Sequence, residues 1–206
     1  MKTIRLSFSF IFSVVSLFFC AAAVYAAVGC QLNDPDRDVK KIFPESTGYK
    51  SDFVSIKEIG GGGLYQKIEA ALGDKFDPVY EAMDVPYSFY KVLKGRETIG
   101  YVHGVNQKGV FGGMQLIIST DLAGKIINFY YQKMSSPEAA KFMDKDFTGK
   151  FNGLALTDFL KGNIGISDPS KESGEDFRYT LRGVKKNLIL LHELELKDNV
   201  LGSVKK

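Results

Sequence analysis

The chain has 206 residues, with 27 Lys and Arg against 24 Asp and Glu. Lys2 and Arg5 lie in an N-terminal leader that holds no acidic residue, so the body that follows is close to neutral. Such a body offers no electrostatic field to a phosphate backbone, which excludes a general nucleic-acid binder. The body has the size of an ordinary domain, and we expect residues 31–206 to form one.

The first 30 residues have the pattern of an export signal. Lys2 and Arg5 precede an uncharged run from Leu6 to Val28, and Val24-Tyr25-Ala26 fits a cleavage site. The run is also long enough to cross a bilayer. Residues 1–30 are therefore either a signal peptide or a membrane anchor. Because the positive residues come first, both alternatives predict an exported body, periplasmic or anchored to the outer face of the membrane.

Cys30 follows Ala27-Val28-Gly29, a tetrapeptide similar to a lipobox. No cysteine occurs after it, so the body has no internal disulfide. Cys30 is either a lipidation site or a spare cysteine beside an ordinary cleavage site. With the leader, it provides the possible means of membrane association.

Residues 31–63 are polar and rich in turns. Asp34-Pro35-Asp36 predicts a turn, followed by a short helix over 36–43 that Pro44 ends. The four glycines at 60–63 lack the following Gly-Lys-Ser/Thr of a phosphate loop, so we interpret them as a flexible hinge before a helix over 64–72.

Four strands follow in two predicted hairpins. Residues 87–92 and 98–103 flank the turn signal Lys94-Gly95-Arg96, and residues 114–119 and 126–131 flank a turn containing Gly124. We expect an antiparallel meander. A helix over 137–145 is predicted next, with Ser136 as its cap and Pro137 in its first turn.

The last helix has the clearest pattern. An apolar stripe recurs at steps of four and three residues, at Phe177, Leu181, Val184, Leu188 and Leu191. Ser173 and Asp176 fit a capping box at its start. The fold class predicted is α+β: an antiparallel sheet meander with a long C-terminal helix packed on it.

Few residues indicate catalysis or metal binding. His103 and His192 are too isolated to indicate a metal or haem site, and we predict no catalytic residue and no metal ligand. The basic residues of the last helix form either a solvated face or a surface for acidic lipids or a partner, the solvated face being the commoner case; they are Arg178, Arg182, Lys185 and Lys186.

One segment has the character of a phosphate site. Residues 163–173 form a hydroxyl-rich loop, with Ser167, Ser170 and Ser173, that leads into the last helix. Helix starts carry unpaired N–H groups and attract phosphate. The alternative is ordinary turn and cap chemistry, and Glu175 and Asp176 would repel a phosphate there.

Several motifs, in this order, resemble those of the FMN-binding domain in flavin-carrying subunits of Rnf-type and sodium-pumping NADH:quinone electron transport complexes. They cover most of residues 85–195 and include Ile99-Gly100-Tyr101-Val102, Gly109 with Phe111-Gly112-Gly113, Asp121 to Ile126, Met134-Ser135-Ser136-Pro137 and Phe147-Thr148-Gly149-Lys150. The resemblance implies an FMN-binding-domain-like fold and FMN as cofactor.

In that family the motif D-x-I/V-S-G-A-T carries FMN, esterified through its phosphate to the threonine. The best counterpart here is Ile166 to Ser170, with Ser170 at the threonine position and Asp168 and Pro169 in place of Gly and Ala. The resemblance thus implies Ser167, Ser170 and Lys150 as cofactor-binding residues. Aligning Ser173-Gly174 with S-G instead leaves no hydroxyl to modify, and Ser135 and Ser136 are the next phosphate candidates.

Two functions are consistent with these motifs. The first is a cell-envelope electron-transfer protein that binds FMN and exchanges electrons with a membrane or envelope redox partner. The second is a degenerate relative that has lost the flavin and serves as a binding or assembly module. For the aromatic residues near the motifs, core packing is expected rather than stacking on a flavin; they are Tyr101, Phe111, Phe129, Tyr130 and Tyr131.

Overall fold

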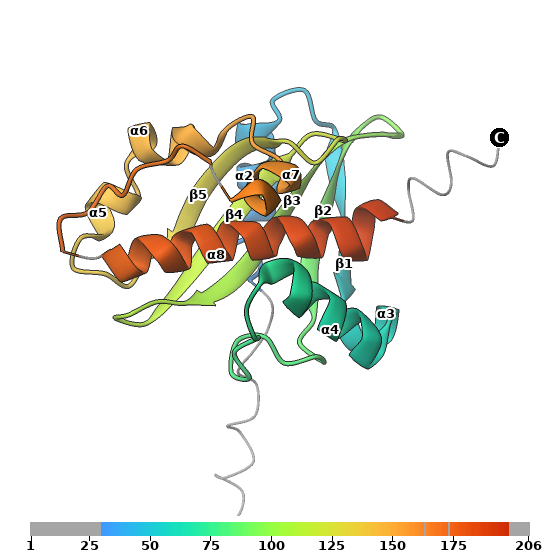
Figure 1. The fold of residues 1–206 in the computed structure, drawn as a ribbon. Helices are drawn as coiled ribbons and strands as arrows, with labels where there is room; N and C mark the ends of the chain where they lie inside the picture. The colour runs from blue at the N-terminus through green and yellow to red at the C-terminus, as the bar shows by residue number, and fades with distance from the viewer. Residues whose placement is uncertain (1–29, 163, 173, 198–206) are drawn as a thin grey trace, which may run out of the picture.

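A computed structural model describes residues 30–162, 164–172 and 174–197 of the chain (Figure 1). Its centre is one antiparallel sheet in which the strands lie in the order of the sequence: β1 Gly48–Val54, β2 Tyr87–Lys94, β3 Glu97–Lys108, β4 Gly113–Thr120 and β5 Ile126–Lys133. The predicted meander and the C-terminal helix across it are confirmed. The leader, residues 1–29, lies outside the described residues.

The two predicted hairpins form because glycine occupies the turn position that needs a positive φ. Gly95 has φ +63° between β2 and β3, and Gly124 has φ +75° between β4 and β5. In the central pair, Val105 of β3 lies opposite Leu116 of β4. Both strands extend beyond the predicted bounds.

Strand β1 was not predicted from the sequence. It pairs antiparallel with β2 at the edge of the sheet, with Tyr49 opposite Val92. Its sequence lacks the regular alternation of a half-buried strand, because neither face of this strand is fully covered and all of its side chains are partly or fully exposed. The stretch 31–63 is therefore more ordered than its polar composition indicated.

Two apolar clusters lie on opposite faces of the sheet. On one face, α8 (Gly174–Leu191) crosses β3 and β4 and packs beside α4 (Gly61–Leu72), over a core that includes Phe129 and Leu188. On the opposite face, α2 (Pro35–Ile42) covers a smaller cluster with Val39. The predicted turn and helix at 34–43 are confirmed, since Asp34 caps α2.

Helix α8 buries the predicted stripe. Val184, Leu188 and Leu191 are almost fully buried, and Phe177 and Leu181 pack partly buried against the same core. The helix continues as a π-helical turn, η3 (His192–Leu196). No helix in the described part of the chain is long and apolar enough to span a bilayer.

The interpretation of residues 60–63 as a hinge is wrong. Gly61 to Gly63 form the first turn of α4, which follows the short α3 (Ile56–Ile59) after a break at Gly60. The Leu64 N–H donates to the Gly60 carbonyl at 3.3 Å. A helical first turn needs only backbone hydrogen bonds, so the absence of side chains does not prevent it.

The helix predicted over 137–145 is divided into short pieces. The chain forms α5 (Ala139–Phe142), α6 (Lys145–Thr148), η2 (Gly149–Phe151) and, further on, α7 (Leu156–Lys161). The break occurs because Asp144 accepts a hydrogen bond from the Asp146 N–H and so caps a new helix. Phe142, Phe147 and Phe151 all reach the main core as a result.

Candidate functional site

The loop before α8 has its polar groups engaged locally. The N–H and the hydroxyl of Ser170 both donate to Asp168 Oδ1, at 2.8 and 2.7 Å. Ser167 is exposed. Ser173, and with it the predicted capping box, lies outside the described residues. The geometry around Ser170 is thus that of an Asx-type turn, in which the hydroxyl already serves as a donor.

The backbone N–H groups that follow Ser170 bind a carboxylate of the protein itself. Glu138 accepts hydrogen bonds from the N–H groups of Lys171 and Glu172, at 3.2 and 3.0 Å, and pairs with Lys141. These donors are the ones a phosphate at this loop would use. Glu138 occupies them although it comes more than thirty residues earlier in the chain.

A second carboxylate lies at the start of α8. Asp176 is fully buried, and its Oδ1 accepts the N–H of Val110 at 2.9 Å. This bond ties the turn between β3 and β4 to the first turn of the helix. Asp176 therefore places a carboxylate at the helix start to which the resemblance assigns the FMN phosphate.

The other predicted site residues lie around the same loop. Ser135 Oγ donates to the carbonyl of Gly113 at 3.0 Å, and Ser136 Oγ accepts the N–H of Glu138 at 3.3 Å. Lys150 is exposed and, with Pro169, lines a shallow hollow of about 410 Å³. Folding thus brings the 135–138 segment and Lys150 to the loop of Ser167 and Ser170, although the two segments are far apart in the sequence.

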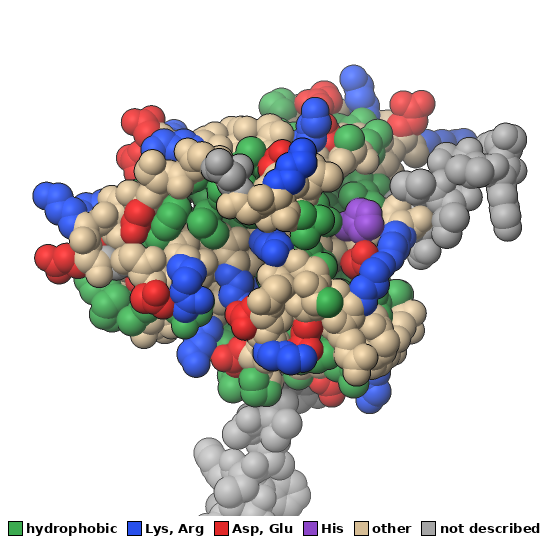
Figure 2. All heavy atoms as spheres, viewed as in Figure 1, with side chains coloured by type: hydrophobic (Ala, Val, Ile, Leu, Met, Phe, Trp, Pro, Cys, Tyr) green, Lys and Arg blue, Asp and Glu red, His purple; other side chains and the backbone are tan. Residues whose placement is uncertain are grey.

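These residues do not fit an FMN phosphate as they stand. An ester at Ser170 would lose the hydroxyl that donates to Asp168 and would place a phosphate beside that carboxylate, and a phosphate on the loop N–H groups would have to displace Glu138. Like charges about 4 Å apart repel by roughly 1 kcal/mol even in water, and more where solvent is excluded. Figure 2 shows acidic and basic side chains interspersed on the α8 face, without a field of one sign.

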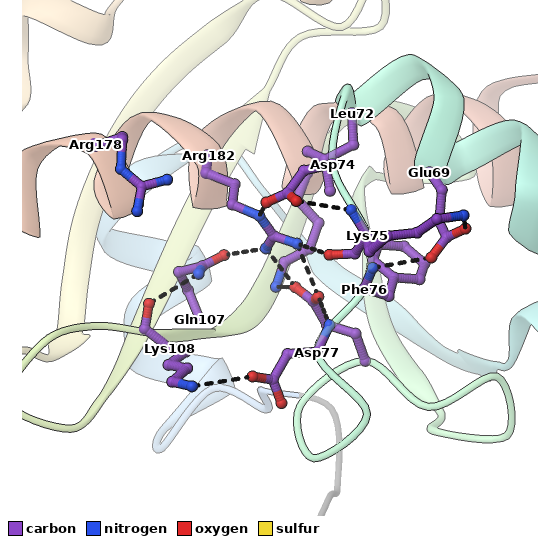
Figure 3. Close-up of polar contacts among 12 residues, drawn as sticks. Glu69, Leu72, Asp74, Lys75, Phe76, Asp77, Gln107, Lys108, Arg178 and Arg182 are labelled. Carbon is purple, nitrogen blue, oxygen red and sulfur yellow. Dashed lines mark hydrogen bonds and ion pairs between the residues drawn. The ribbon is translucent and has the colours of Figure 1, made fainter. Parts of the chain in front are cut away.

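A buried ionic cluster, which the sequence patterns did not indicate, lies beside the middle of α8 (Figure 3). The guanidinium of Arg182 donates from all three nitrogens, to the carboxylates of Asp74 and Glu81, to the side-chain oxygen of Gln107 and to the carbonyl of Lys75, at 2.8 to 3.1 Å. Lys186 pairs with Glu81 and donates to the carbonyl of Asn106 at 2.7 Å. The interpretation of these basic residues as a solvated face is wrong for Arg182 and Lys186, because the loop over 73–86 covers them.

The charges of this cluster determine its protonation. Burial opposes ionisation of Glu81, but Lys186 and Arg182 outweigh it and lower the pKa of that carboxyl below its ordinary value. Burial lowers the pKa of Lys186 to about 8, against the attraction of Glu81. Arg182 and Lys186 are four residues apart, beside the apolar stripe, and this spacing is the one sequence signal that they share a face. Nothing in the loop sequence marks Glu81 as their partner.

His103 and Asn187 extend this polar region into the core. The His103 ring stacks on Phe89 with centroids 4.0 Å apart, and its Nδ1 lies 2.9 Å from the carbonyl of Ser88. Burial lowers the pKa of His103 to about 4. Asn187 donates to the carbonyl of His103 at 3.1 Å. These contacts link α8 to β2 and β3, and they fit a structural role.

The expected core packing of the aromatic residues is confirmed at Tyr101, Phe129 and Tyr131, which are buried. Tyr130 is half-buried on the α2 face. The expectation is wrong for Phe111, which is 57% exposed at the turn between β3 and β4. The Val110 N–H donates to Asp176 and so fixes the backbone of this turn. In this position the Phe111 side chain lies outside the core.

Cys30 is buried in the smaller apolar cluster, against β3. A Cβ on Gly104 would lie 2.5 Å from the Cys30 carbonyl oxygen, so only glycine permits this approach. Burial raises the pKa of the Cys30 thiol to about 12. A lipid on this sulfur would require the side chain to leave the cluster, so lipidation and the observed packing exclude each other.

No protein-family model matches the chain, and a search of the curated proteins finds no match. Within the described residues, no group of three or more His, Cys, Asp or Glu side chains is arranged to hold a metal ion. The resemblance to FMN-binding domains therefore depends on the motifs quoted above.

Proposed function

We propose that this chain is a non-catalytic binding module of the cell envelope, built on a scaffold that resembles the FMN-binding domain but without a flavin on its Ser170 loop. The observation that carries the proposal is the bond between the Glu138 carboxylate and the N–H groups of Lys171 and Glu172. The protein supplies its own anion at the position that the flavin phosphate would take. Its export is proposed from the leader.

The test compares flavin content in wild type, Ser170→Ala and Glu138→Gln. The full chain is produced with its leader in a host that also expresses a flavin transferase, and the purified proteins are examined by flavin absorbance and by mass after denaturation. We expect no flavin on the wild type and no effect of Ser170→Ala on uptake of added FMN. A mass increase of one FMN moiety that survives denaturation and disappears in Ser170→Ala would overturn the proposal.

That outcome would favour a second function, the flavin-dependent electron carrier. One observation supports it: Lys150 and Pro169, the residue before Ser170, line the same hollow, together with Asp144 and Asp146. The Lys150 ammonium in this hollow would suit a phosphate, provided that Glu138 moved away. In that case FMN would supply the redox chemistry and the protein would orient it toward an envelope redox partner.

A further inference from the structure

A second hollow, which no residue of the Ser170 loop lines, lies at the edge strand β5. It has a volume of about 600 Å³. Its walls come from three segments that are distant in sequence: α2, residues 127–130 of β5, and residues 143–152 around α6. This volume is within the range of about 300 to 1,000 Å³ that is usual for small-molecule sites.

The groove combines exposed apolar side chains with polar ones. Ile127 and Met143 are 39% and 47% exposed, which is high for large apolar side chains in a folded domain. Ile42 adds a partly buried apolar side chain on the α2 wall. The amides of Asn128 and Asn152 also line the groove. Exposed apolar side chains grouped in a concave site are typical of a surface that a ligand covers.

The charge of the groove is positive. Lys41 projects from the α2 wall and Lys145 from the α6 wall, and neither is among the residues of the described chain that form ion pairs. Asp38 is the one acid among the described lining residues, and its carboxylate already accepts two bonds from Arg37, at 3.1 and 3.0 Å. Two lysines that form no ion pair with any described residue therefore line the same hollow.

We propose that this groove binds an amphipathic anion, with a carboxylate or phosphate held by Lys41 and Lys145 and an apolar body against Ile127 and Met143. The inference rests on the proposed binding module and names its ligand class. Two sources have this chemistry: a fatty-acyl chain from the envelope, and a free flavin phosphate bound without a covalent link.

Two pairs of probes separate the contributions of charge and apolar body. Decanoate is compared with decanol, and FMN with riboflavin, by isothermal titration calorimetry on the mature protein at low salt. We expect at least one anion to bind about tenfold more tightly than its neutral partner, because one charge-assisted hydrogen bond accounts for that factor. The tighter anion identifies the source. Equal binding of anion and neutral analogue in both pairs would overturn the proposal.

The variant test uses Lys41→Gln with Lys145→Gln, and a matched control with Lys50→Gln and Lys94→Gln, two exposed lysines of β1 and β2 that do not line the groove. We expect the groove variant to lose about tenfold or more in affinity for the anion, while the control binds like wild type. Unchanged affinity in the groove variant would overturn the inference. If FMN binding depends on Ser170 and neither anion depends on the two groove lysines, both the groove site and the proposed flavin-free module are wrong; if no anion binds and the Ser170 loop takes no flavin, only the groove site is wrong.

Discussion

Arg182 on α8 and Glu81 in the loop before β2 are joined by two hydrogen bonds, of 2.8 and 3.1 Å, across 101 residues of sequence. The Glu81 carboxylate is almost fully buried and also pairs with Lys186. The pair therefore holds an otherwise irregular loop against the helix, and it connects the N-terminal half of the body to the last helix.

Removing the Arg182 side chain should destabilise the fold. In Arg182→Ala the carboxylates of Glu81 and Asp74, the Gln107 side chain and the Lys75 carbonyl all lose the guanidinium. Breaking a buried pair costs about 3 kcal/mol at the lower end of the range, which applies here because Lys186 stays beside Glu81. Urea denaturation measures the loss. Arg178→Ala is the matched control on the same helix, because Arg178 is exposed and its contacts are local, an ion pair with Glu175 one turn away and a cation–π contact with Tyr179. An equal loss in both variants would show that the buried cluster does not hold the loop.

The protein should lose stability as the pH falls through the range where histidine titrates. Burial lowers the pKa of His103 from 6.5 to about 4, so the ring stays neutral in the fold while the unfolded chain takes up a proton below pH 6.5. The unfolded state then binds more protons, and stability decreases as the pH falls. The stabilising contribution of the Glu81 carboxylate is lost only as the pH falls below its ordinary pKa of 4.5. Between pH 6.5 and about 5 we expect a loss of roughly 2 kcal/mol that His103→Gln abolishes. Parallel stability profiles for wild type and variant would contradict the buried neutral state.

The thiol of Cys30 should be protected in the native protein. It is buried with a pKa raised to about 12, so both access and thiolate formation are suppressed. We expect no labelling by a thiol reagent in the folded mature protein and complete labelling in urea. Labelling at the rate of a free cysteine in the native state would mean that the segment at Cys30 is not docked on β3. A protein that remains unlabelled in urea and carries added lipid mass would instead establish lipidation.

The apolar stripe of α8 should be essential for folding. Leu188→Asp places a charge in the main core, where Leu188 is 2% exposed, and the desolvation penalty amounts to several kcal/mol. Soluble expression and thermal melting report the effect. Leu160→Asp on α7 is the control, because Leu160 is 53% exposed and should tolerate the change. Cooperative melting of Leu188→Asp at the wild-type temperature would contradict the burial of the stripe.

Most of the fold could be predicted because its signals are local. The turn glycines at 95 and 124 and the apolar stripe on α8 each depend on a few neighbouring residues. The elements that were not predicted correctly share one cause, which is that tertiary contacts determine them. Edge strand β1 gains its order from pairing with β2, and the helix expected over 137–145 is divided by a cap at Asp144 that only packing of the Phe residues reveals. The predicted site residues around Ser170 do come together, but the Glu138 carboxylate that meets them could not be identified from its position in the sequence.

The sequence by itself determined the meander, the long C-terminal helix and the near-neutral charge of the body. Hydrophobic periodicity and turn chemistry depend on residues close together in the sequence, and net charge depends on composition alone. Only the tertiary structure decided which charges meet. Glu81 pairs with Arg182 and Lys186, Glu138 caps the loop of Ser170, and Lys41 and Lys145 face one groove. Electrostatic partners of this kind depend on distance in space and on burial, neither of which a local pattern contains.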